Sequence, residues 1–166
     1  EARTLLADTF EQLGYGSENG TWRDFFLSGA TELRHGSFGT PTQTSAADIV
    51  TQLTPAMLFD ALAIQVHGPR CWDEQLTLDV VLTDTDERYR LRLANGVLTY
   101  SPRPQRGVPD ATITTTSPTL PMMALGMLSA DGFDAAGVEI SGDATALLRL
   151  VAALDPGDPD FAIVTP

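Results

Sequence analysis

Few residues of this chain have the chemistry of a metal ligand or a nucleophile: two histidines, His35 and His67, and one cysteine, Cys71. A zinc site needs about four clustered ligands, and these three residues form no short ligand motif. Each histidine precedes a glycine at the end of an expected helix, where an imidazolium interacts favourably with the last carbonyl groups. The thiol lies beside Trp72 with Arg70 as its basic neighbour, which is typical of a structural cysteine. We therefore expect no metal site, no cofactor and no catalytic residue in this segment.

Acidic residues are abundant, but their pattern favours turns and solvated charge over catalysis. The runs DTDE and DPGDPD are typical of turns, and the sequence contains no P-loop, GxSxG or GxGxxG motif. The 166 residues include 22 Asp and Glu against 10 basic residues, all arginine, for a net charge of -12. Such a chain repels phosphate backbones and anionic headgroups, so we expect no nucleic-acid partner. No apolar run approaches the roughly 20 residues of a membrane-spanning helix, so we expect no integral membrane protein.

The order of apolar and turn residues predicts a helical segment, a linker and an α+β domain. Residues 1–35 have apolar residues at helical spacing and form two expected helices that end at glycines. Residues 36–44, GSFGTPTQT, have the composition of a linker. Residues 45–166 alternate helical and strand patterns and form the expected α+β domain. The chain starts at Glu1, so we expect a segment of a longer protein, which leaves its localisation unknown.

The α+β domain is predicted as a five-stranded, mainly antiparallel sheet covered by helices. Strands are expected over 75–83, 87–94, 97–101, 110–116 and 138–140, because apolar and polar residues alternate there. A two-residue turn at Thr85-Asp86 would pair Leu78 with Leu93 and set Asp79 opposite Arg92. The Asn95-Gly96 turn would pair Leu93 with Leu98. Helices are expected over 45–53, 55–67, 117–128 and 141–154, the second of them capped by Thr54 and started by Pro55.

Two of these helices carry more apolar side chains than one sheet face can cover. Their surplus could be ordinary core, or it could line a cavity for an apolar guest, to which flexible methionines adapt well. The candidate lining residues are Phe59, Leu62, Val66, Met122, Met123, Leu125 and Met127. Trp22, Phe25 and Phe26 in the helical segment are too apolar for a free pair of helices, so we expect them to pack on a larger body or on a second copy of the chain.

Several stretches of the sequence resemble the C-terminal portion of bacterial alkyl sulfatases of the metallo-β-lactamase superfamily. They are YGSENGTWRDFFLSGATELRHG, LTPAMLFDALAIQVHGP, LTLDVVLTDTDERYRLRLANGVLTY, DATITTT and DPDFAIVTP, in that order. The resemblance implies that residues 1–35 are the last helices of a dimerisation domain. It also implies that residues 45–166 form a domain similar to sterol carrier protein type 2, with an apolar tunnel. The zinc motif of the family is absent, so its catalytic residues have no counterparts here.

Together, the residues and the resemblance predict a non-catalytic module that binds an alkyl chain or lipid. Such a module would help the hydrolase domain of a zinc-dependent parent enzyme to capture its substrate, within a possible homodimer. The alternative is a structural or assembly domain with a closed core and no ligand. A third interpretation, an autonomous enzyme, has no support in the motifs.

Overall fold

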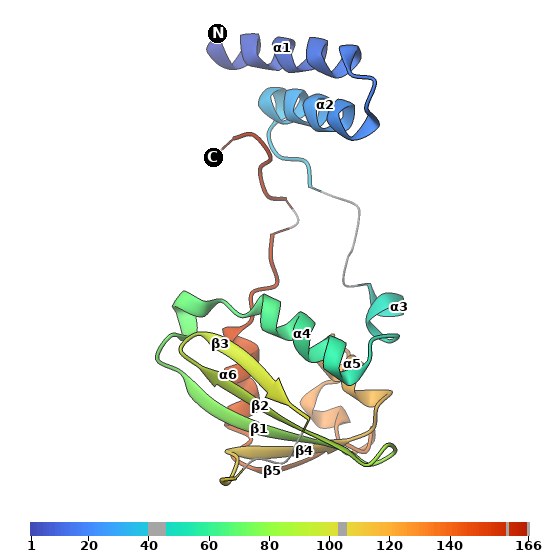
Figure 1. Cartoon of the computed structure of the whole chain (residues 1–166), viewed down its shortest axis with the longest axis vertical. Coiled ribbons are helices and arrows are strands. Elements are labelled where there is room, and N and C mark those ends of the chain that lie inside the picture. The colour runs from blue at the N-terminus through green and yellow to red at the C-terminus, as the bar shows by residue number, and fades with distance from the viewer. Residues whose placement is uncertain (40–45, 103–105, 159, 166) are drawn as a thin grey trace. The chain divides into compact units, whose positions relative to one another are not determined.

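The computed structural model describes residues 1–39, 46–102, 106–158 and 160–165 (Figure 1). The chain divides into two compact units. The helical unit comprises Glu1–Gln43 together with Asp158–Pro166, and the α/β unit comprises Thr44–Gly157. The C-terminal residues, which the sequence analysis placed in the α+β domain, thus group with the N-terminal helices.

The helical unit is built on an antiparallel pair, α1 (Ala2–Gly16) and α2 (Gly20–His35) (Figure 1). The side chain of Asn19 accepts a hydrogen bond from the backbone N–H of Trp22 and so caps α2. A Cβ on Gly14 would lie 2.7 Å from a side-chain carbon of Leu27, so this glycine lets the two helices approach closely. The rings of Phe10 and Phe26 pack between them, with centroids 5.7 Å apart.

The α/β unit contains a single mixed sheet among its described residues. Its strands are β1 (Gln75–Leu82), β2 (Glu87–Ala94), β3 (Val97–Ser101), β4 (Ala111–Thr115) and β5 (Glu139–Gly142). Their order is β3-β2-β1-β4-β5, and every neighbouring pair is antiparallel except β1 and β4, which are parallel. The predicted fold class, with five mainly antiparallel strands, is confirmed.

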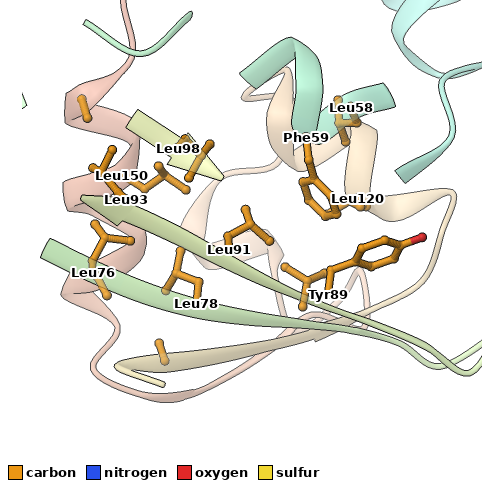
Figure 2. Close-up of a cluster of buried hydrophobic side chains, with 14 of the residues drawn as sticks. Leu58, Phe59, Leu76, Leu78, Tyr89, Leu91, Leu93, Leu98, Leu120 and Leu150 are labelled. Carbon is orange, nitrogen blue, oxygen red and sulfur yellow. The ribbon is translucent and has the colours of Figure 1, made fainter. Parts of the chain in front are cut away.

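Helices cover the apolar face of this sheet. They are α3 (Ala47–Val50), α4 (Pro55–Gln65), α5 (Thr119–Ala124) and α6 (Thr145–Ala153), with short 3₁₀ turns at Gly68–Cys71 and Ala130–Gly132. Figure 2 shows the labelled leucines of β1 and β2 pointing to the side of the sheet on which Leu58, Phe59, Leu120 and Leu150 of the helices lie. The predicted start of α4 is confirmed, because Thr54 accepts a hydrogen bond from the N–H of Met57 and Pro55 follows it.

The predicted register of β1 and β2 is wrong by two residues. Leu78 pairs with Leu91 and Asp79 with Arg90, because residues 83–86 form a four-residue turn in which Asp86 has a φ of 56°. A shift of two preserves the alternation of faces, so the apolar face is as predicted. The register of β2 and β3 is confirmed, with Leu93 paired to Leu98.

The polar face of β2 is not uniformly exposed. Arg90 is 8% exposed and forms a two-pronged ion pair with Asp79, with Nε–Oδ1 and Nη2–Oδ2 distances of 2.6 and 2.7 Å. Its Nη1 also donates to the carbonyls of Arg106 and Gly107. Alternation along β2 places Arg90 on the polar face of the strand, and the loop after β3 supplies acceptors there that the strand pattern does not reveal.

Candidate ligand-binding cavity

An apolar cavity of about 350 Å³ lies between the sheet and the helices of the α/β unit. Its floor is formed by buried side chains from three strands: Leu78, Val80, Leu91 and Ile113. Leu58, Phe59 and Leu62 of α4 form one wall, and residues of α5 and α6 form the others. Ligand pockets in proteins typically measure about 300–1,000 Å³, so the space is large enough for a small ligand.

Three of the seven predicted lining residues face this cavity. They are Phe59, which is 1% exposed, Leu62 and Met123. Phe59 is held by an aromatic cluster, in which its ring lies 5.1 Å from that of Tyr89 and 5.5 Å from that of Tyr100. Phe59 of this wall is therefore positioned by its contacts with Tyr89 of β2 and Tyr100 of β3, on a helix whose start is capped by Thr54.

The other four predicted residues do not line the cavity, for local reasons. Helix α5 is shorter than the predicted 117–128, because it ends at Ala124 with Leu125 as its C-cap, and Gly126 follows with a φ of 66°. Met127 therefore lies beyond the helix and is 57% exposed, while Leu125 packs against the core elsewhere. Met122 is half-buried, and Val66 follows α4 and pairs with Leu154 in an isolated bridge.

Helix α6 contributes a wall that the sequence analysis did not assign to a ligand site. Its lining residues are Leu147, Leu148, Leu150 and Val151, followed by Leu154. Their helical spacing marks them as apolar in the sequence, but spacing alone does not distinguish a core contact from a cavity wall. Phe133, between α5 and β5, also lines the cavity and carries no periodic pattern that could have identified it.

The rim of the cavity lies between α6 and the end of α5. Leu148 and Val151 line the cavity and are nevertheless 68% and 57% exposed. Ala124 and Gly126, at the end of α5, also line it and are exposed. A straight apolar guest could therefore enter here without displacing the buried side chains of the floor.

The cavity wall carries no titratable side chain among the described residues. Arg149, which lies on α6, is held away by an ion pair to Glu74, with an Nε–Oε2 distance of 3.0 Å. The nearby phenol of Tyr89 has a pKa raised by burial and by the adjacent Glu87. The site is thus uncharged, so it offers shape and dispersion contacts to a guest and no partner for an anionic group.

Two of the three residues considered for metal or nucleophilic chemistry, His67 and Cys71, have structural contacts, and His35 is exposed as the last residue of α2. The Nδ1 atom of His67 accepts a hydrogen bond of 3.1 Å from the N–H of Arg70 and so caps a 3₁₀ turn. Cys71 is buried and its thiol donates to the carbonyl of His67. Across residues 1–39, 46–102, 106–158 and 160–165, no three His, Cys, Asp or Glu side chains gather in a way that could hold a metal ion. No helix in that part of the chain has the length and apolarity needed to cross a membrane.

Comparison with protein families gives two matches. The family described as alkyl sulfatase C-terminal matches residues 43–166, which is most of the chain. The chain belongs to the alkyl sulfatase C-terminal family. The family described as alkyl sulfatase dimerisation matches residues 1–36.

Relatives of this alkyl sulfatase C-terminal segment are much longer than it is. A linear primary-alkylsulfatase from Pseudomonas sp. is 38% identical over 167 residues, covering 99% of this chain and 25% of the relative. An (R)-specific secondary-alkylsulfatase from the same genus is also 38% identical, and the Alkyl/aryl-sulfatase BDS1 of Saccharomyces cerevisiae is 32% identical. The chain thus spans about a quarter of the length of the curated relatives it matches.

The structure of a solved alkylsulfatase agrees with this assignment. The stereoselective inverting sec-alkylsulfatase Pisa1 from Pseudomonas sp. has a TM-score of 0.80 and 35% identity over 97% of this chain and 25% of its own. The ubiquinone synthesis protein UbiJ-SCP2 is more distant, with a TM-score of 0.48 and 16% identity over 64% of this chain and 93% of its own.

Proposed function

We propose that the α/β unit is a non-catalytic module that holds an alkyl chain or a similar apolar ligand. The observation that carries this proposal is the uncharged cavity of about 350 Å³ with an exposed apolar rim. An engineered apolar cavity of about 150 Å³ holds benzene, so equal packing would allow about fourteen carbon atoms here. The alternative of a structural domain with a closed core has less support, because a closed core has no such space.

We infer further that the module serves a parent enzyme of the alkyl sulfatase type. The relatives named above are alkylsulfatases of about four times this length, and this segment matches only their C-terminal portion. A zinc-dependent hydrolase domain elsewhere in the parent chain would then act on substrate that the module captures. Within this division, we propose that residues 1–35 end the dimerisation domain and that residues 45–166 belong to the sterol-carrier-like segment, whose last residues, 158–166, group with the helices. The linker expected over 36–44 falls mostly outside the described residues.

The helical unit supports a role in assembly. Trp22 and Phe25 are 62% and 56% exposed, and together with Thr21 and Phe26 they line an apolar groove on α2. Leu5 and Tyr15 of α1 are each 69% exposed. Exposed apolar groups in this number mark interaction surfaces, so we propose that they contact the rest of the dimerisation domain or a second copy in a homodimer.

A series of straight-chain alcohols tests the binding proposal. Each buried methylene contributes about 0.8 kcal/mol, so affinity should rise with chain length until the cavity is full. Ordering costs should limit the best dissociation constant to roughly micromolar. Calorimetry of the folded protein with alcohols of eight to sixteen carbons should show the rise and then a plateau. Affinity that does not depend on chain length would contradict the proposal.

A further inference from the structure

The C-terminal tail of the chain is bound by one buried carboxylate of the helical unit. Glu32, on α2, is 1% exposed. Its Oε1 accepts hydrogen bonds from the N–H of Val164 at 3.1 Å and from the N–H and hydroxyl of Thr165 at 2.8 and 2.6 Å. Its Oε2 accepts a further short hydrogen bond from the N–H of Ile163. Three consecutive backbone amides and one hydroxyl therefore converge on a single carboxylate.

In the described part of the chain, this carboxylate has four hydrogen-bond donors, and none of them is a cation. Arg3 donates to the backbone carbonyls of Leu33 and Glu32. The pKa of Glu32 is lowered to about 2, because the hydroxyl of Thr165 and the tail amides bind the ionised form more strongly than burial disfavours it. A buried carboxylate without a cation is costly unless its hydrogen bonds are satisfied, and here the tail satisfies them.

The surface of α2 is also shaped for the tail. Gly29 lies three residues before Glu32, on the same side of the helix. A Cβ on Gly29 would lie 3.1 Å from a methyl carbon of Val164, so the absence of a side chain makes room for the tail. The same glycine allows close contact with Phe10 of α1, 3.0 Å from that Cβ position. Glu32 and Gly29 together form a seat for residues 163–165.

We propose that residues 163–165 act as a strap, anchored by Glu32, that gives the α/β unit a second tether to the helical unit. One chain segment, residues 37–46, leads from α2 to α3. A second, residues 154–162, leads from α6 to the seat on α2. Each of these two segments, of ten and nine residues, spans at most about 36 Å, so with the strap closed the α/β unit is attached to the helices at two points and its movement is more restricted than with one. With the strap released, only the first segment restricts the movement of the α/β unit relative to the helices.

Amide hydrogen exchange on the full chain tests the anchor. In the unaltered protein the amides of Ile163, Val164 and Thr165 should exchange at least tenfold more slowly than unprotected amides, since all three are bound. Glu32→Ala should abolish this protection. Glu18→Ala is the matched control, because Glu18 is an exposed glutamate of the same unit and the same charge is removed. Unprotected amides in the unaltered protein, or protection that survives Glu32→Ala, would overturn the proposal.

Small-angle X-ray scattering tests the tether. Glu32→Ala should increase the mean radius of gyration relative to Glu18→Ala, because one of two restraints is lost. Deleting residues 161–166 changes no residue of α2 and should produce the same increase, which keeps the test valid if Glu32→Ala disturbs the helices. An unchanged radius of gyration in the deletion variant would contradict the tether.

Discussion

Replacing Arg90 by alanine should destabilise the α/β unit far more than its place on the polar face of β2 suggests. The guanidinium is 8% exposed, forms two hydrogen bonds to Asp79 and donates to two loop carbonyls. Removing one member of a fully buried ion pair costs about 3–5 kcal/mol, because the other charge is left uncompensated. The side chain of Asp79 is 28% exposed and regains some water, so we expect a loss of about 2–4 kcal/mol.

Two neighbouring residues provide the comparison. Arg92 lies on the same face of β2 and is exposed, so Arg92→Ala should cost less than about 0.5 kcal/mol. Leu91 lies on the opposite face and is 2% exposed, so Leu91→Ala should cost about 2–4 kcal/mol. Urea unfolding followed by circular dichroism gives all three free energies of unfolding.

A double-mutant cycle isolates the ion pair. Asp79→Ala alone leaves the guanidinium of Arg90 without its partner. In the Arg90→Ala background that charge is absent, so Asp79→Ala should lower the free energy of unfolding by less than it does alone. A loss for Arg90→Ala no larger than that for Arg92→Ala would refute the reasoning, because Arg90 would then be solvated as the strand pattern alone suggests.

Three further predictions follow from the contacts of each unit. The pKa of Glu32 is lowered from its ordinary value of 4.5 to about 2, so its ionised form stabilises the fold above pH 4.5, and this stabilisation is lost as the pH falls toward about 2. Glu32→Gln should therefore make the free energy of unfolding depend less on pH in this range. After dialysis, metal analysis should find far less than one equivalent of zinc per chain, and a sulfate-release assay should detect no hydrolysis of dodecyl sulfate. One equivalent of zinc or measurable hydrolysis would contradict this prediction. Sedimentation should show a larger species for the full chain than for one beginning at Thr44, because the exposed Trp22 and Phe25 would bind a second copy; two monomers of equal stability would count against the assembly role.

The sequence predicts the sheet well because its information is local. Alternation along β1 and β2 and the Asn95-Gly96 turn, with φ values of 52° and 69°, determine which side chains share a face. The register of β1 and β2 was missed because a four-residue turn and a two-residue turn give the same alternation. The length of α5 was missed because Leu125 and Met127 fit a helical pattern, while the left-handed Gly126 ends the helix.

The features that the sequence does not predict depend on distant contacts. Residues Glu32 and Thr165 are 133 positions apart, and neither belongs to a motif that would place them together. The guanidinium of Arg90 donates to two carbonyls of a loop, and the loop sequence has no regular pattern from which these contacts could be predicted. The cavity itself was expected, but its α6 wall was not, because periodicity identifies apolar side chains without showing where packing leaves space.

The most direct measurement of the central claim is calorimetric titration of 1-dodecanol into three folded proteins: the unaltered chain, Leu62→Trp and Ile64→Trp. Leu62 lines the cavity, whereas Ile64 lies two residues along α4, is 85% exposed and does not line it. If the cavity holds the alkyl chain, the unaltered protein and Ile64→Trp bind with equal, roughly micromolar affinity, and Leu62→Trp binds at least tenfold more weakly. No binding below the millimolar range by the folded unaltered protein, or equal binding by the two tryptophan variants, would contradict the claim.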